Sequence, residues 1–94
     1  MSKSIIQDNW DECYLCGCTR NLEEHHIFGG NPGRQLSEHY GLKVRLCQPC
    51  HNLPPEGVHY NNKNMDGLRR IGQKAFEGKY SDKSFITIFG KNYI

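Results

Sequence analysis

The chain has 94 residues, of which 36% are hydrophobic and 23% are charged, and its net charge is +2. This length suits one small domain with a thin apolar core, and the composition excludes an intrinsically disordered chain. No apolar run approaches the roughly 20 residues of a membrane span, and residues 1–10 lack the apolar stretch of a signal peptide. We therefore expect a cytoplasmic protein without a membrane anchor.

The first half of the chain predicts a lead-in, two strands and a short helix. Residues 1–12 are polar, with Ile5, Ile6 and Trp10 as the expected anchors onto the core. Residues 21–28 predict a strand, 29–33 a loop, and 34–40 one or two helical turns that end at Gly41. Over residues 42–46, alternation places Leu42, Val44 and Leu46 inward, and Lys43 and Arg45 outward.

The second half of the chain predicts helices. Pro54 and Pro55 stop any helix that starts after Cys50. Apolar residues then recur at helical spacing between Asn64, the expected N-cap, and Gly78, the expected stop. Ser81 is the expected cap of a last short helix closed by Gly90, and the β-branched residues of 86–88 leave a strand as the alternative there.

Two pairs of cysteines have the spacing of zinc ligands. Cys13 and Cys16 are separated by two residues, as are Cys47 and Cys50, and each pair spans a tight turn that can aim both sulfurs at one ion. Gly17 fits the first turn, where we expect little space for a Cβ atom. A disulfide framework is disfavoured, because the cysteine count is odd and no secretion signal is present. We predict a structural Zn²⁺ ion that supplies folding energy, with Cys18 either replacing Cys16 or remaining a spare thiol.

Charge is distributed unevenly along the chain. Residues 1–60 carry five Lys or Arg and seven Asp or Glu, a net charge of −2, whereas residues 61–94 carry seven and three, a net charge of +4. A basic C-terminal part suits a polyanionic partner, although a solvated helix face would produce the same count.

Three histidines are placed by features already described. His25 and His26 are adjacent on the predicted strand, so their rings point to opposite faces, and one can face a metal while the other faces a reacting group. His51 directly follows the last predicted zinc ligand, which would fix its position. Their occurrence together in so short a chain favours a site over isolated surface residues.

Taken together, these motifs resemble a known family. Cys13-x2-Cys16, Leu22-Glu-Glu-His25-His26-Ile27 and Leu46-Cys47-x2-Cys50-His51-Asn52 resemble the HNH endonucleases of the ββα-metal superfamily. The likeness is greatest to the small phage or prophage members that carry a four-cysteine zinc. Residues 72–77 and 89–93 are less specifically similar to phage proteins near the recombination-enhancement nucleases. The resemblance implies an α+β fold, in which a zinc-stapled β-hairpin plus helices surrounds one catalytic divalent ion.

The resemblance also implies roles for individual residues. His26 matches the family's general base, and His25 and His51 match ligands of the catalytic ion. His59 is included as a further ligand that returns after a loop inserted behind Pro54 and Pro55, with an ordinary loop histidine as the alternative. The family's middle asparagine has no clear counterpart, and Asn31 and Gln35 are the candidates for it.

We therefore expect residues 1–94 to be one nuclease domain, with a zinc and ββα-metal core over about 13–59 and a basic helical extension over 60–94. It would hydrolyse phosphodiester bonds of DNA with low sequence specificity. The catalytic ion would be Mg²⁺ or Mn²⁺, or else Zn²⁺ or Ni²⁺, since imidazole ligands suit Mg²⁺ poorly. The candidates for phosphate contacts are Arg34, Lys43, Arg45, Arg69, Arg70 and Lys74.

Two other classes of function use the same residues differently. One is a non-catalytic zinc-ribbon module that binds nucleic acid, and the other is an accessory recombination factor of a phage that works with a recombination or replication protein. A phage-encoded chain would act in the host cytoplasm. The oligomeric state is left open.

Overall fold

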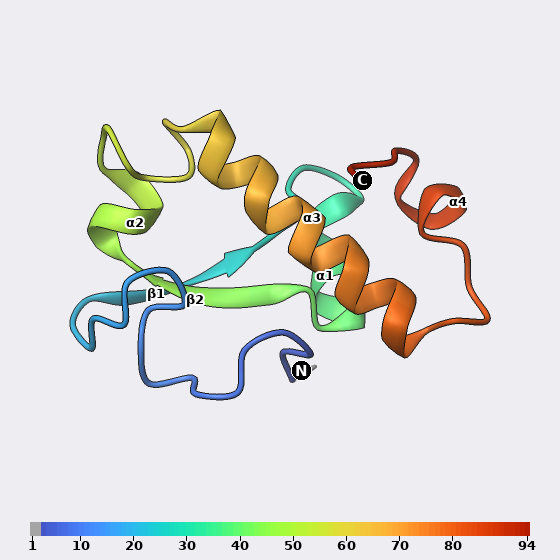
Figure 1. Ribbon diagram of the computed structural model, residues 1–94, viewed down its shortest axis with the longest axis horizontal. Coiled ribbons are helices and arrows are strands. Elements are labelled where there is room, and N and C mark those ends of the chain that lie inside the picture. The colour runs from blue at the N-terminus through green and yellow to red at the C-terminus, as the bar shows by residue number, and fades with distance from the viewer. Residues whose placement is uncertain (1–2) are drawn as a thin grey trace.

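The centre of the fold is an antiparallel pair of strands, β1 (Leu22–His26) and β2 (Lys43–Cys47). The structure is a computed structural model that describes residues 3–94, and Figure 1 shows the two strands crossed by a long helix. The register pairs Leu22 with Cys47 and His26 with Lys43. The expected α+β architecture, with a small antiparallel sheet and helices, is confirmed.

The connection between the strands contains helix α1 (Gly33–Tyr40), which ends at Gly41 as expected. Gly41 has a φ of 73°, a left-handed conformation that glycine adopts without a steric penalty. β1 is shorter than the predicted strand and ends at His26. Two residues later, both backbone groups of Phe28 bond the side chain of Ser37. The Ser37 hydroxyl accepts from the Phe28 N–H and donates to the Phe28 carbonyl, both at 3.0 Å.

On β2 the predicted inward residues are buried, but one predicted outward residue is buried too. Leu42, Val44 and Leu46 are fully inaccessible to solvent. Lys43 is only 3% exposed, so its expected solvent-facing position is wrong. The cause is tertiary, because Lys43 lies under Trp10, with its Nζ 6.0 Å from the centre of the indole ring.

Three helices follow, and their limits differ slightly from those predicted. The short helix α2 (Gln48–Asn52) ends before Pro54 and Pro55, as expected. The long helix α3 (Asn62–Lys79) starts three residues early, because the Asn61 side chain accepts from the Asn64 N–H and is the cap. It continues past Gly78, the predicted stop.

The C-terminal segment is a helix and not a strand. This helix, α4 (Phe85–Phe89), is capped by Ser84, whose hydroxyl accepts from the Thr87 N–H at 3.2 Å, rather than by Ser81. Gly90 closes it with a φ of 82°, as predicted. Phe85 is buried, and its ring centre lies 5.5 Å from that of Phe76 on α3 and 5.2 Å from that of Phe28, which fixes α4 against the rest of the molecule.

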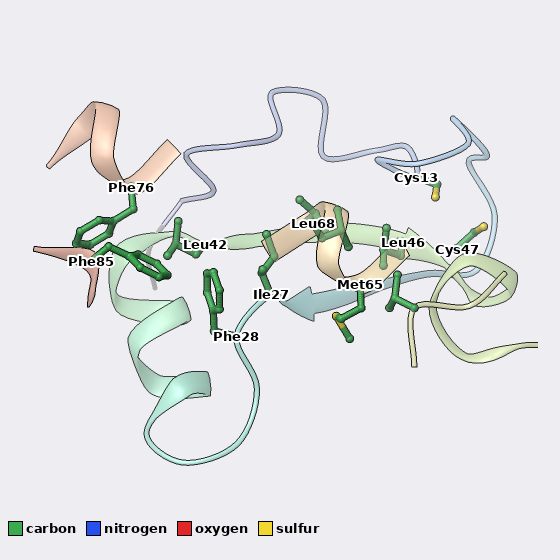
Figure 2. Close-up of a cluster of buried hydrophobic side chains, with 12 residues drawn as sticks. Cys13, Ile27, Phe28, Leu42, Leu46, Cys47, Met65, Leu68, Phe76 and Phe85 are labelled. Carbon is green, nitrogen blue, oxygen red and sulfur yellow. The ribbon is translucent and has the colours of Figure 1, made fainter. Parts of the chain in front are cut away.

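Buried hydrophobic side chains form one continuous cluster between the sheet and α3. Figure 2 shows Phe76 and Phe85 at one end of this cluster and the sulfurs of Cys13 and Cys47 at the other. Met65 and Leu68 of α3 pack in it with Val44 and Leu46 of β2. Residues 60–94 therefore supply part of the core itself. Within residues 3–94, no helix combines the length and hydrophobicity needed to cross a bilayer.

The N-terminal segment, residues 3–12, lies along the free edge of β2, on the other side of the sheet from α3 (Figure 1). Ser4 Oγ donates to the Lys43 carbonyl at 2.6 Å, and Gln7 Oε1 accepts from the Arg45 N–H at 2.7 Å. These bonds satisfy backbone groups that an exposed strand edge would leave unpaired. Ile5 and Ile6 pack against the core, as expected.

Candidate functional site

The four cysteines of the two predicted pairs converge at one end of the core. Cys13 and Cys16 lie in the turns before β1, Cys47 ends β2, and Cys50 belongs to α2. Their sulfur atoms lie within 4.8 Å of one another, and the sulfurs of Cys16 and Cys47 are 3.5 Å apart. Tetrahedral zinc–thiolate bonds of about 2.3 Å would separate the sulfurs by about 3.8 Å. This cluster could hold a zinc ion.

The surroundings of the thiols favour a bound cation. Burial raises the pKa of Cys13, but backbone hydrogen bonds at Cys47, Cys16 and Leu15 outweigh burial and lower it to about 7. Burial raises the pKa of both Cys47 and Cys50, and at Cys50 the neighbouring thiols raise it further. Several thiolates in so small a space repel one another, and a zinc ion compensates for that repulsion.

Local backbone geometry explains why the first pair forms a turn. Gly17 has a φ of 80°, and its N–H donates to the Cys13 carbonyl at 2.8 Å. A Cβ atom at Gly17 would meet nothing within 4 Å, so the expected lack of space is wrong and the positive φ is the reason for glycine. Cys18 lies outside the cluster, where its exposed sulfur accepts from the Arg20 N–H at 3.4 Å.

The three histidines predicted to bind a catalytic ion also converge. His25 comes from β1, His51 from α2, and His59 from the turn between α2 and α3. One ring nitrogen of each lies within 4.8 Å of the others, and we call this group the histidine cluster. The ring centres are 5.0 Å apart for His25 and His51, and 4.8 Å apart for His51 and His59.

His25 has the most unusual environment of the three. His25 is 3% exposed to solvent, and its Nε2 atom is buried without a hydrogen-bond partner. Burial, followed by the charges of His51 and His59, lowers the pKa of His25 to about 3. The ring is therefore neutral at neutral pH. Leaving a buried polar atom unpaired costs about 1–3 kcal/mol, and a metal ion bound by this nitrogen would remove that cost.

His51 and His59 are oriented by their neighbours. His51 Nδ1 is 2.9 Å from Glu23 Oε1, which also accepts from the Asn52 side chain at 2.9 Å. This contact leaves Nε2 of His51 facing Nε2 of His59 at 3.1 Å. Two nitrogens bound to one ion at about 2.1 Å would be about 3.0–3.4 Å apart. Sequence reasoning missed Glu23, although a carboxylate behind a ligating histidine is a common arrangement.

His26 lies on the opposite face of β1, as strand alternation predicts. Its Nε2 is 3.0 Å from Glu38 Oε1 on α1 and 3.5 Å from Glu24 Oε1. It borders a hollow of about 600 Å³ together with Arg34, Gln35, Glu38 and His39. Gln35, a candidate for the family's middle asparagine, thus lies beside His26, whereas Asn31 lines a different hollow beside Arg69.

The predicted phosphate contacts divide into accessible and enclosed residues. Arg34, Arg70 and Lys74 are exposed. Arg69 is half-buried and is paired with Asp66 at 2.9 Å. Its positive charge is one of those that lower the pKa of His25.

Two of the six predicted phosphate contacts are held within the fold. Lys43 is enclosed, and Arg45 is half-buried with its guanidinium 5.6 Å from the centre of the Trp10 ring. Its Nη1 donates to the Trp10 carbonyl at 3.2 Å. The structure therefore does not offer Lys43 to a duplex, and it assigns Arg45 a packing contact.

The cysteine and histidine clusters adjoin in the sequence through Cys50 and His51, so the segment that could bind zinc also orients an imidazole. The chemistry that this arrangement allows is metal binding by three imidazoles, with a fourth imidazole and a carboxylate on the other face of β1. Searches of family models, curated proteins and solved structures found nothing that matches this chain.

Proposed function

We propose that this protein is a metal-dependent DNA endonuclease that hydrolyses phosphodiester bonds. The observation that carries the proposal is the buried Nε2 of His25, which lacks a hydrogen-bond partner and belongs to a cluster of three imidazoles. A purely structural histidine in such a place would be paired. The resemblance to HNH endonucleases, which rests on these same residues, points to the same chemistry.

His25, His51 and His59 would hold the divalent ion. Such an ion supplies charge to a phosphate oxygen and to the departing 3′ oxygen. Glu23 supports this role, because its contact with His51 Nδ1 fixes the ring with the other nitrogen available as a ligand. Three imidazole ligands favour Mn²⁺, Ni²⁺ or Zn²⁺ over Mg²⁺.

His26 is the proposed general base, which takes a proton from the attacking water. It is adjacent to His25 in β1, and its ring lies on the opposite face of the strand, so a phosphate held at the ion would have to extend past the end of β1 to meet it. Because His26 is not one of the proposed metal ligands, it can accept a proton without any change in the coordination of the ion.

DNA is the proposed substrate because of the charge on α3 and the segment after it. Residues 61–94 carry a net charge of +4, and Arg70 and Lys74 are exposed on α3. Arg69, on the same helix, is the proposed contact for a phosphate near the histidine cluster. These are backbone contacts and carry no sequence information, so we expect low sequence specificity and binding that weakens with salt.

The test is relaxation of supercoiled plasmid by the zinc-loaded protein with added Mn²⁺ or Mg²⁺. We expect wild-type protein to nick the plasmid and His26→Ala to lose at least about a hundredfold of that rate, since a general base contributes that much. His25→Ala should lose activity and also lose Mn²⁺ binding measured by calorimetry. Lys3→Gln, which removes an exposed positive charge outside residues 61–94, is the matched control.

Other results would point to the other functions. Binding of DNA by wild-type protein and by His26→Ala, with no cleavage by either, would contradict the enzyme and favour a zinc-ribbon binding module. Cleavage seen only with branched or single-stranded DNA, or with a recombination protein present, would favour the accessory factor of a phage. Zinc content measured for every variant shows whether the fold is intact.

A further inference from the structure

A partly buried ion-pair network surrounds His26 on the face of the sheet away from the histidine cluster. Lys43 is the direct cross-strand partner of His26, so their side chains share this face. Lys43 Nζ donates to both carboxylate oxygens of Glu38, at 2.9 and 3.1 Å. We call Glu24, His26, Glu38 and Lys43 the His26 network.

The Glu38 carboxylate is held rigidly. Lys43 is 3% exposed and bonds both of its oxygens, which fixes the plane of the group. Helix α1, which carries Glu38, is tied to the end of β1 by the two hydrogen bonds between Ser37 and Phe28. Neither the side chain nor its helix is free to turn away from His26.

Glu38 is the better placed of the two carboxylates near His26. Its Oε1 is 3.0 Å from His26 Nε2, within hydrogen-bond range, whereas Glu24 Oε1 is 3.5 Å away. Glu24 is also the more distant partner of Lys43, at 3.6 Å. A metal ion is not required in this network, because the Lys43 ammonium already supplies a positive charge between the carboxylates.

We propose that Glu38, held by Lys43, is a positioning residue that fixes the ring and the tautomer of His26. The Nε2–H of His26 donates to the Glu38 carboxylate, which leaves the lone pair on Nδ1 to accept the proton of the attacking water. Water loses that proton to Nδ1, and the hydroxide oxygen forms the new bond to phosphorus. The bond from phosphorus to the 3′ oxygen breaks, and the released 3′ oxygen takes a proton from solvent water. The inference rests on the proposed endonuclease function, and it deepens that function by naming the base atom and its support.

The consequences for the rate follow from this arrangement. Without Glu38, His26 can rotate and can place its proton on either nitrogen, so only a fraction of molecules holds the base correctly. We expect substrate binding to be largely unaffected, because Glu38 belongs neither to the histidine cluster nor to the basic residues of 61–94. We therefore expect Glu38→Leu to lower kcat by about 10- to 100-fold with KM changed less than about twofold, which is less than the roughly 100- to 10,000-fold that a whole general base contributes.

The experiment compares four variants with the wild-type protein, each checked for zinc content and helicity. Glu38→Leu removes the acceptor, and Glu38→Gln keeps an oxygen that can accept from Nε2–H while removing the charge, so it should retain more activity than Glu38→Leu. Glu24→Gln should lose less than Glu38→Leu, since its contact is longer. Asp82→Asn removes one exposed carboxylate and should match the wild-type protein.

The second readout is ¹⁵N NMR of the His26 ring at fixed pH in the zinc-loaded protein without a second ion. We expect the Nε2–H tautomer in the wild-type protein and in Glu38→Gln, and a mixture of tautomers in Glu38→Leu. If Glu38→Leu does not fold, Glu38→Gln still tests the inference, because it changes the side chain less.

The outcomes separate this inference from the proposed function. If wild-type protein cleaves DNA and Glu38→Leu cleaves it equally well, or if the wild-type ring is the Nδ1–H tautomer, the role of Glu38 is wrong and the nuclease stands. If wild-type protein does not cleave under any condition, the nuclease is wrong and the positioning role is overturned with it. A loss that appears in KM rather than kcat would assign Glu38 to binding and overturn the inference.

Discussion

Folding changes the environment of His25 more than that of any other ionisable side chain in the histidine cluster. In the unfolded chain it is an ordinary imidazole with a pKa near 6.5, whereas burial and the charges of His51 and His59 lower its folded pKa to about 3. Between these two values the unfolded state binds a proton that the folded state does not. The free energy of unfolding therefore falls as the pH falls through this interval.

We predict that wild-type protein without a second metal ion loses stability from pH 7.5 to pH 5.5, and that His25→Gln loses less. The contribution of His25 to the free energy of unfolding is fully present above pH 6.5. Below that pH it declines by up to about 1.4 kcal/mol per pH unit. Urea unfolding at the two pH values measures it, with one equivalent of zinc supplied throughout.

His39→Gln is the control for this measurement, because His39 is an exposed histidine on α1. We expect it to keep the pH dependence of the wild-type protein. An unchanged pH dependence in His25→Gln, with the change appearing in His39→Gln instead, would show that His25 is not the buried neutral group.

For individual residues, the sequence predicts the face of the sheet to which a side chain points better than the residues that the side chain contacts. Alternation along β1 correctly predicts that His25 and His26 point to opposite faces, because that property is local to a strand. It does not reveal Glu38, which is twelve residues from His26 and meets it only when α1 folds back. For Lys43, alternation predicts the correct face but the wrong exposure, since residues 3–12 and α1 cover that face.

Helix α3 passes close to the end of β1 at Gly72. A Cβ atom there would lie 3.1 Å from Phe28 Cε2 and 3.3 Å from Ile27 Cγ2. The Phe28 ring cannot easily move, because it packs against Phe85 and Phe89 with ring centres 5.2 and 4.9 Å away. Gly72 thus sets how closely the helix approaches the sheet.

We predict opposite effects for two glycine substitutions in this helix. Gly67→Ala should raise the free energy of unfolding by up to about 1 kcal/mol, because alanine favours a helix and its Cβ would meet nothing within 4 Å. Gly72→Ala should lower it by about 1–2 kcal/mol, since overpacking costs more than helix propensity gains.

Thermal unfolding of both variants at constant zinc measures these changes, at about 4–8 °C per kcal/mol for a chain of this size. A stabilised Gly72→Ala would mean that Phe28 moves aside, and the contact would then not limit the approach of α3. Neither sign can be predicted from the helical periodicity alone, because the sequence shows three glycines in one helix and not which of them faces the sheet.

The limits of the helices show why element boundaries are hard to predict. The caps of α3 and α4 lie at Asn61 and Ser84, three residues from the predicted Asn64 and Ser81, although each predicted residue is of a capping type. Both segments offer two capping residues within a single turn, and tertiary packing selects between them. Gly41 and Gly90 are predicted correctly because a left-handed C-terminus strongly favours glycine.

For the whole molecule, the cysteine cluster joins parts of the chain that otherwise have few ties. Cys13 and Cys16 follow the N-terminal segment, and Cys47 and Cys50 belong to β2 and α2. The N-terminal segment lies along β2 and covers Lys43 with the side chain of Trp10. An ion bound to all four sulfurs would therefore hold this cover in place and also fix α2, from which His51 reaches the histidine cluster.

We predict that Cys47→Ser unfolds most of the molecule, whereas Cys18→Ser leaves it intact. In small zinc domains the ion contributes on the order of 10 kcal/mol to folding, which exceeds what a core of this size provides on its own. Wild-type protein and Cys18→Ser should each retain about one zinc ion per chain after dialysis, as expected for one closed four-thiolate site. Circular dichroism should show helix loss only in Cys47→Ser or after strong chelation.

Loss of zinc from Cys18→Ser would show that Cys18 belongs to the ligand set. A folded Cys47→Ser without zinc would show that the hydrophobic cluster suffices to hold α2 and the N-terminal segment together.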